Sequence, residues 1–341
     1  MENLLPKGFV FRPGRKEDVE AAVEMFNIDA KQLVGVEKFI LQEVANEWST
    51  PGFNQETDSR IVISPEGKVV GYCDVWDMKP HISIDCWGRV HPEYTGQGIG
   101  SHLLEWAQKR AEGAIPKAPP EARVFIKCSA ITLNQAAEEL FQEAGMQRVR
   151  YFFRMVIDMD RHPPEPQWPE GIEIRPMVVG KDEWLMTEAV VEAFRDHWGH
   201  VEKPIEEEHE RWMHYVKNND DFDPQLYFLA WDGDQIAGAV LCWPKSHEDA
   251  DMGWVDVLCV RRPWRKRGLG SALLQHSFGV FHQRGKLRVG LGVDAENLTG
   301  ALRLYERAGM HADPNRTYVA YEKELRPGVD LRTLQPDEAK A

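Results

Sequence analysis

A turn in the second half of the chain has the residue types of an anion-binding site. It lies between a β-type run and a helical pattern and reads Arg265-Lys-Arg-Gly-Leu-Gly-Ser271. Glycine at 268 and 270 lets the backbone approach a ligand without a Cβ in the way. The N-terminus of the following helix presents unpaired N–H groups and a positive dipole end. Three adjacent cations add positive charge, so the turn predicts a site for an anion such as a pyrophosphate.

A glycine-rich turn of this kind can also belong to a different kind of site, or to none. An isolated Gly-x-Gly is often no more than a tight turn. A Rossmann dinucleotide site needs a third glycine at a fixed spacing, which is missing here. A Walker loop needs a Gly-Lys-Ser/Thr triplet, and none follows at the right distance.

Three segments of the first half recur in the same order in the second half, at offsets of 163 to 170 residues. The pairs are Phe9–Pro13 with Ile172–Pro176, Gly98–Leu104 with Gly268–Leu274, and Glu139–Met146 with Arg303–Met310. The sequence therefore predicts a tandem duplication. We expect an N-terminal domain over 1–162, a proline-rich linker over 163–170, a C-terminal domain over 171–326 and a loose tail over 327–341.

Each half alternates short β-type runs with helical patterns. In the second half, the runs at 225–231 and 235–243 flank Asp232-Gly-Asp234, a hairpin signal. Further strands are expected at 254–260 and 288–293, with helices after Gly268 and over 299–308. This alternation favours an α/β fold (α+β, with a mixed sheet) in each half.

The charge and the cysteine content of the chain disfavour several classes of partner and site. With 41 basic and 55 acidic residues the formal charge is −14, which disfavours nucleic acid and anionic membranes as partners and suits an amine-bearing one. Five scattered cysteines predict neither a disulfide scaffold nor a thiolate zinc site. Neither a signal peptide nor an 18-residue apolar run is present, so a cytoplasmic protein is expected, as a monomer or homodimer.

Two motifs together resemble the GNAT N-acetyltransferase superfamily. Arg265-x-x-Gly268-x-Gly270 is similar to its acetyl-coenzyme A signature, Gln/Arg-x-x-Gly-x-Gly/Ala. The segment Ala301-x-x-Leu-Tyr305-Glu-x-x-Gly-Met310 looks like its later Ala-x-x-Leu-Tyr-Glu-x-x-Gly-Phe motif. Both halves carry the pattern, as in tandem GNAT proteins of the mycothiol synthase type. The resemblance implies two GNAT domains that use acetyl-CoA as cosubstrate and no metal.

The resemblance also implies roles for single residues. Tyr305 would protonate the departing thiolate, because a phenol has a pKa near that of a thiol. Asn297 would contact the pantetheine arm, although it lies eight residues before Tyr305 where the family has seven. The backbone of the strand end would bind the same arm, and the turn would bind the pyrophosphate. These coenzyme residues are Leu258, Cys259, Val260, Arg265, Lys266, Arg267, Gly268, Leu269, Gly270 and Ser271.

The first half lacks the chemical groups of the second. Thr95, Gly96 and Gln97 stand in place of the three cations, and Phe141 replaces Tyr305. Its glycines remain, and they would permit a second coenzyme site there. That site would comprise Val90, Gly96, Gly98, Gly100 and Ser101. We expect a degenerate N-terminal domain and chemistry in the C-terminal domain.

The attacking amine must lose a proton to a base. Family members often carry a Glu at the position of Trp254 here, so Asp256, two residues on, becomes the first candidate. Asp256 aligns with Cys86 in the first half. The alternatives are a structural role for Asp256, or a base in the loop before this strand, at His247, Glu248, Asp249 or Asp251.

The acceptor side is expected at Asp196-His197-Trp198-Gly-His200, after the first helix of the second domain. His197 and His200 could contact the substrate or act as the base. Alternatively, Trp198 simply packs a polar loop; a metal pair lacks a third ligand.

The expected activity is direct transfer of acetyl from acetyl-CoA to a primary amine of a small molecule. Acetylation of a cysteinyl amine, as by mycothiol synthase-like enzymes, and a non-catalytic acyl-CoA sensor are the alternatives.

Overall fold

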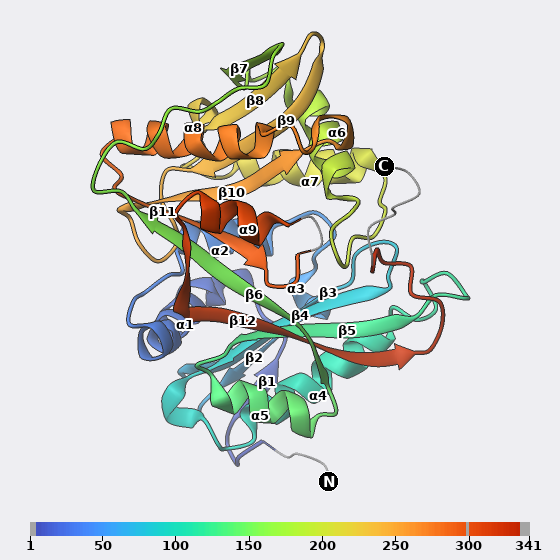
Figure 1. Cartoon of the computed structure of the whole chain (residues 1–341). Helices are drawn as coiled ribbons and strands as arrows, with labels where there is room; N and C mark the ends of the chain where they lie inside the picture. The colour runs from blue at the N-terminus through green and yellow to red at the C-terminus, as the bar shows by residue number, and fades with distance from the viewer. Residues whose placement is uncertain (1–4, 298–299, 335–341) are drawn as a thin grey trace. The chain divides into compact units, whose positions relative to one another are not determined.

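The structure, a computed structural model, describes residues 5–297 and 300–334. The chain divides into two compact units. The N-terminal unit consists of Met1–Tyr151 and Thr317–Leu331, and the C-terminal unit of Phe152–Arg316 and Arg332–Ala341. Each unit contains a mixed sheet with helices, which confirms the predicted α/β class (Figure 1).

The N-terminal unit has strands in the order β1-β2-β3-β4-β5-β12, with β4 and β5 parallel and the remaining neighbours antiparallel. Its elements are β1 Val10–Arg12, α1 Val19–Val34, α2 Leu41–Trp48, α3 Gln55–Asp58, β2 Ser59–Ile63, β3 Val69–Trp76, β4 Ser83–Val90, α4 Ile99–Glu112, β5 Val124–Ile131, α5 Gln135–Glu143 and the last part of β12 His311–Arg326.

The C-terminal unit repeats this arrangement with strands in the order β6-β11-β10-β9-β8-β7, in which β10 and β11 are parallel. Its elements are β6 Gln147–Asp158, β7 Ile172–Pro176, α6 Glu183–Phe194, α7 Ile205–Lys217, β8 Tyr227–Asp232, β9 Gln235–Trp243, β10 Met252–Val260, α8 Leu269–Gln283, β11 Arg288–Asp294 and α9 Ala301–Arg307. The predicted hairpin is confirmed, since Asp232 pairs with Gln235.

The last strand of each sequence repeat belongs to the other unit. From Phe152 onward, β6 pairs with β11, and from Tyr318 onward β12 pairs with β5. The compact units therefore differ from the ranges 1–162 and 171–326 expected from the repeat. In both sheets one antiparallel strand lies beside the second parallel strand. Since β6 and β12 are equivalent strands of the two repeats, they can be exchanged between the sheets, as in a domain swap. Residues 159–171 contain no helix or strand in the structure.

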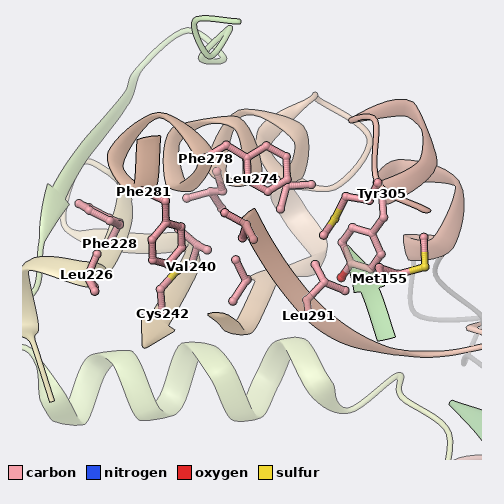
Figure 2. Packing of buried hydrophobic residues seen from close by; sticks show 14 of the residues in the cluster. Met155, Leu226, Phe228, Val240, Cys242, Leu274, Phe278, Phe281, Leu291 and Tyr305 are labelled. Carbon is pink, nitrogen blue, oxygen red and sulfur yellow. The ribbon is translucent and has the colours of Figure 1, made fainter. Parts of the chain in front are cut away.

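Two apolar clusters cover the two faces of the C-terminal sheet. One contains Leu273, Phe278 and Phe281 of α8, and Figure 2 shows it with Tyr305 near Met155 and Leu291. The other contains Met186 and Ala189 of α6 with Tyr227, Leu241 and Trp243 of the sheet. The amphipathic helices thus fix both sides of β10, the central strand of the expected site.

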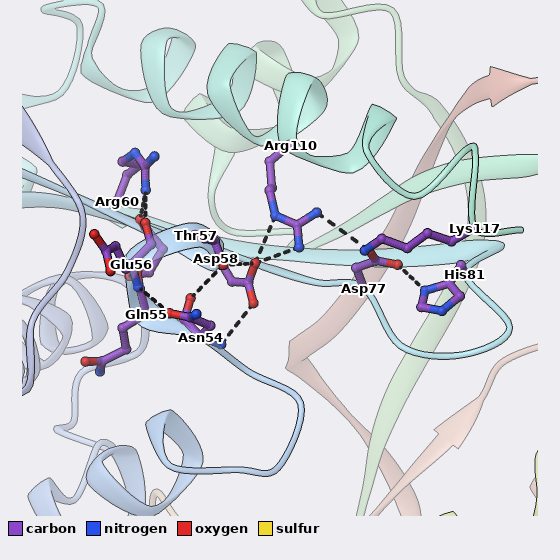
Figure 3. Close-up of polar contacts among 11 residues, drawn as sticks. Asn54, Gln55, Glu56, Thr57, Asp58, Arg60, Asp77, His81, Arg110 and Lys117 are labelled. Atoms are coloured by element: carbon purple, nitrogen blue, oxygen red, sulfur yellow. Dashed lines mark hydrogen bonds and ion pairs between the residues drawn. The ribbon is translucent and has the colours of Figure 1, made fainter.

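A polar network around the buried carboxylates of Asp58 and Asp77 holds α4 in the N-terminal unit (Figure 3). Arg110 donates two hydrogen bonds to Asp58 and lies 3.6 Å from Asp77. Asp77 also pairs with Lys117 and His81 at 2.6 and 2.7 Å. These bonds outweigh desolvation and lower the pKa of Asp77. Removing one partner from such a network destabilises the protein, because a buried charge would remain unpaired.

Two glycines of the C-terminal unit give opposite expectations for stability. A Cβ on Gly253 would lie 2.4 Å from the ring of Phe281, whereas one on Gly279, inside α8, meets nothing within 4 Å. Gly253→Ala should destabilise the protein by about 1–3 kcal/mol through overpacking. Gly279→Ala should stabilise it by about 0.5–1 kcal/mol, because alanine restricts the unfolded chain. Urea unfolding of both variants checks this; equal midpoints would contradict it.

Candidate active site

The predicted anion-binding turn joins β10 to α8. Gly268 adopts φ +87° as the N-cap residue, and Lys266 has the left-handed φ +61°. No side chain caps the first turn of α8 in the described structure, so its N–H groups remain available. Lys266 and Arg267 are exposed, and neither makes a hydrogen bond or ion pair with any described residue.

Gly270 has a packing role. A Cβ there would lie 3.2 Å from Leu304 of α9 and 3.6 Å from Val260 of β10. Gly100 in the N-terminal unit has the same surroundings, with Leu140 at 3.2 Å and Val90 at 3.7 Å. This glycine therefore allows close approach of two helices and a strand, a role that the expectation of ligand access did not include.

Arg265 turns toward the protein. Its Nε donates to the carbonyl of Val260 and its Nη2 to the carbonyl of Ala193, both at 3.0 Å, while Nη1 donates to Asp196. Arg262 donates to the same carboxylate, at 2.9 Å through Nε. Of the three predicted cations, Lys266 and Arg267 are thus the ones open to a ligand. The sequence analysis did not predict that Asp196 binds Arg262 and Arg265. The sequence shows only an acidic residue far upstream of an arginine-rich turn, and this does not indicate that they pair.

β10 and β11 separate where the coenzyme arm was expected. They pair in parallel from Met252 with Arg288 to Val255 with Leu291. Beyond Val255, the described residues of these strands do not pair with each other, although β10 runs to Val260 and β11 to Asp294. We call this region the divergence. Leu258, Cys259 and Val260 lie on its β10 side, where backbone groups facing β11 can bind an extended ligand arm.

Asp256 lies where the divergence begins, in a β-bulge. The register between β10 and β9 shifts between Val255 and Val257, so no residue of β9 stands opposite Asp256 in the strand pairing. The pairing of β3 with β4 runs without a shift, and Cys86 occupies there the position of Val255. The expected equivalence of Asp256 with Cys86 was therefore wrong: Asp256 is an additional residue that the first half lacks.

Asp256 stands beside an aromatic cluster. Tyr227 lies between Trp212 and Trp243, with ring centroids 5.8 and 6.0 Å apart, and Tyr215 contacts Trp243 at 5.4 Å. Asp256 is solvent-accessible, yet the surrounding bulky side chains desolvate its carboxylate and raise its pKa. Trp243, Trp254 and His247 partly offset this effect. A raised pKa strengthens a carboxylate as a base.

Tyr305 lies on α9 in the other apolar cluster, with 7% of its surface exposed. Burial raises its pKa to about 12, well above the value near a thiol that was expected from the sequence. Its hydroxyl makes no hydrogen bond with the described residues. The equivalent Phe141 on α5 packs against Tyr321, with ring centroids 5.2 Å apart.

The three residues expected on the acceptor side lie in different surroundings. His197 contacts the ring of Phe194, and burial together with the charge of Arg265 lowers its pKa. His200 pairs with Glu202 at 3.1 Å. Trp198 lies under the guanidinium of Arg332, at 5.3 Å. The charge of Arg265 on His197 places this histidine near the turn.

Asn297 has a local structural partner. Its Oδ1 accepts a hydrogen bond from the amide of Ala301 at 3.2 Å, at the start of α9. Asn134 does the same for Ala137 at 3.0 Å. Residues 298 and 299 lie outside the described chain.

The turn of the N-terminal unit keeps the backbone shape. Gly96 and Gly98 both have φ +80°, and Gly98 is the N-cap residue of α4, just before Gly100 and Ser101. This turn has Gly96 at the position of Lys266, so it retains the left-handed backbone conformation but lacks the positive charge of the lysine. Within the described residues of the whole chain, no group of three or more histidine, cysteine or acidic residues could hold a metal ion. No described helix is long and apolar enough to cross a membrane.

Comparisons with known proteins agree with this geometry. Residues 187–310 match the model of the acetyltransferase (GNAT) family, and residues 57–146 match that of an acetyltransferase (GNAT) domain. A mycothiol acetyltransferase of Streptomyces scabiei is 29% identical over 80% of each chain. That of Thermobifida fusca is 30% identical over 73% of this chain and 77% of its own.

Solved structures show the same architecture. A GCN5-related N-acetyltransferase from Sphaerobacter thermophilus is 35% identical with a TM-score of 0.77, covering 96% of this chain and 99% of its own. A tandem GNAT protein from the clavulanic acid biosynthesis pathway, 15% identical over 94% of this chain and 100% of its own, has a TM-score of 0.71 and supports the fold. The chain belongs to the GNAT family and is a tandem acyl-CoA-dependent N-acetyltransferase.

Proposed function

We propose that the C-terminal unit transfers acetyl from acetyl-CoA directly to the primary amine of a small-molecule acceptor. The observation that carries this proposal is the divergence of β10 and β11, with Asp256 in the bulge where it begins. In the N-terminal unit β4 and β5 also separate, after Asp85, but β3 and β4 pair without this bulge and without an acid at its place. This unit also lacks the cations and the phenol, so we assign it no catalysis.

The pyrophosphate would lie at the N-terminus of α8. The uncapped N–H groups of Leu269, Gly270 and Ser271 suit phosphate oxygens, and Lys266 and Arg267 supply free positive charge. The pantetheine arm would extend along Leu258–Val260, where the β10 backbone is unpaired on the β11 side. The residues present fit the coenzyme in both charge and shape.

Asp256 and Tyr305 would carry the proton transfers. Asp256 accepts the proton of the amine, directly or through water, as the new N–C bond to the acetyl carbon forms. The C–S bond breaks, and the departing thiolate takes a proton from Tyr305. A pKa of about 12 for this phenol does not prevent transfer, because the same apolar surroundings also raise the pKa of the thiol.

The aromatic cluster beside Asp256 suits an acceptor with an apolar or planar part and a cationic amine. A cysteinyl amine is the leading specific candidate, since relatives at 29–30% identity are named mycothiol acetyltransferases. A panel of primary amines that includes cysteinyl amides, assayed for release of the coenzyme thiol, tests the proposal. Lack of turnover with the whole panel, together with tight acetyl-CoA binding, would favour a sensor.

Replacing Lys266 by glycine should preserve or raise the stability of the protein but weaken its binding of acetyl-CoA. A lysine with φ +61° is strained, so Lys266→Gly should leave the free energy of unfolding equal or raise it by up to about 1 kcal/mol. The same variant loses a cation, and its Kd for acetyl-CoA should rise roughly tenfold, about 1.4 kcal/mol. Calorimetric titration and urea unfolding measure both. As control, Arg267→Gln should weaken binding without gaining stability; unchanged affinity in both variants would place the pyrophosphate elsewhere.

The Asp256→Asn variant should catalyse acetyl transfer more slowly than the wild type but be more stable at neutral pH. Because the folded site raises the pKa of Asp256, its ionised form lowers stability once the pH exceeds its unfolded pKa of about 4. The variant should therefore gain melting temperature at pH 7 and gain nothing below pH 3. Its maximal rate should fall by roughly 10²-fold or more, and the rise of rate with pH should disappear. Asp234→Asn, in the exposed β8–β9 turn, is the control. A wild-type pH–rate profile would make Asp256 structural and point to His197 or His247.

Tyr305→Phe removes one hydroxyl and reproduces what Phe141 provides in the other unit. The chemical step should slow by roughly 10²–10⁴-fold, while acetyl-CoA affinity stays the same, since the ring and its packing remain. Single-turnover kinetics separates the two. The reciprocal Phe141→Tyr should add no activity, because the N-terminal turn lacks cations. Full activity of Tyr305→Phe would move the acid to another residue.

A further inference from the structure

Asp196 lies just after α6 and is the most heavily bonded carboxylate near the turn. Its side chain is 3% exposed and accepts hydrogen bonds from both Arg262 and Arg265. These two guanidinium groups lower the pKa of Asp196 to about 2. The carboxylate is therefore ionised at all physiological pH values. A buried ionised group with two charge-assisted partners cannot move away from them without a large cost.

The arginines extend this contact into the turn. Arg265 also donates to the carbonyl of Val260, at the end of β10, and to that of Ala193, in α6. One guanidinium thus joins the strand end, the helix and Asp196. The turn that follows Arg265 carries Lys266 and Gly268. Its geometry therefore depends on where Asp196 holds the arginine.

Asp196 also begins the loop that ends at His200, and Thr333 bonds to both ends of this loop. The amide of Gly199 donates to the carbonyl of Thr333, and the amide of Thr333 donates to the carbonyl of His200, both at 2.9 Å. The hydroxyl of Thr333 donates to the carbonyl of Arg195 at 2.9 Å. The segment Arg332–Leu334 therefore holds the loop at both ends, and the turn holds it at Asp196.

We propose that Asp196 is a positioning residue that holds the turn in the shape that binds acetyl-CoA and couples this binding to the loop 196–200 and the segment Arg332–Leu334. This inference rests on the proposed coenzyme site. His197 lies within the same loop, next to the charge of Arg265, so the coupling reaches a residue expected on the acceptor side. Binding of the cosubstrate thereby orders the loop before the acceptor arrives.

Simple electrostatics and positioning predict opposite effects of removing this charge. Asp196→Asn deletes a negative charge beside the anionic pyrophosphate and releases two arginines. If Asp196 only competed with the ligand, acetyl-CoA would bind more tightly. If Asp196 positions the turn, the Kd should rise roughly tenfold, within the usual range of coupling between sites. A merely structural residue would lower the melting temperature and leave the Kd unchanged.

Asp182 provides a matched control. It also accepts hydrogen bonds from one arginine, Arg175, and from the amide of Val178, and its side chain is 1% exposed. Asp182→Asn should lower stability by a comparable amount without changing acetyl-CoA affinity. Arg262→Gln, which removes one partner while keeping Asp196, is the second variant should Asp196→Asn fail to fold. It should weaken acetyl-CoA binding less than Asp196→Asn does.

Hydrogen exchange on the full chain, with and without saturating acetyl-CoA, tests the coupling. In the wild type, acetyl-CoA should slow exchange of the first amides of α8 and also of Gly199 and Thr333. In Asp196→Asn at saturation, protection of α8 should remain while that of Gly199 and Thr333 is lost. Protection of α8 alone in the wild type, or unchanged protection in Asp196→Asn, would overturn the inference. Failure of acetyl-CoA to protect α8 in the wild type would instead overturn the proposed coenzyme site.

Discussion

The separation of two parallel strands at one bulge is the constraint on which the C-terminal unit depends. β10 pairs with β11 only as far as Val255, and the residue inserted next is Asp256. An inserted residue breaks the ladder locally and redirects the strand. β4 and β5 of the N-terminal unit also stop pairing, after Asp85 and Lys127, without an inserted residue between β3 and β4. In the C-terminal unit the bulge therefore adds the carboxylate of Asp256 beside backbone groups that the separation of the parallel strands leaves unpaired. The helices that cover the two faces of the sheet hold the strands in this arrangement.

Comparison of the two repeats separates the residues that set the backbone conformation of the turn from those that supply its charge. Both units have a glycine N-cap in the left-handed region, and both have a glycine packed against a leucine and a valine. They differ two residues before the N-cap, where Gly96 adopts φ +80° without strain and Lys266 adopts φ +61° despite its side chain. Strained backbone conformations persist where the surroundings determine them and are concentrated at functional sites. The strain at Lys266 is consistent with a positive charge that serves a ligand.

Charge is distributed unevenly in a chain with a formal charge of −14. Around the turn, Asp196 neutralises part of the charge of Arg262 and Arg265, and Glu192 pairs with Arg261 at 2.6 Å. Lys266 and Arg267 remain without such partners in the described structure. The arginines thus stabilise the scaffold, while the two exposed cations provide the local field that an anionic cosubstrate would meet.

The sequence by itself determined the class of fold, the duplication and the family, because these depend on local patterns and on two motifs of fixed spacing. The hairpin around Gly233, the helix after Gly268 and the strands at 254–260 and 288–293 follow from short-range rules, and the structure has them. It did not determine which unit each closing strand joins, since β6 and β12 are the equivalent last strands of the two repeats and local sequence patterns do not specify their long-range partners. It also misaligned Asp256 with Cys86, because a bulge adds one residue without any local signal. The partners of Arg265 were hidden for a similar reason: Asp196 lies 69 residues earlier in the chain, and only the packing of α6 against the sheet brings the two charges together.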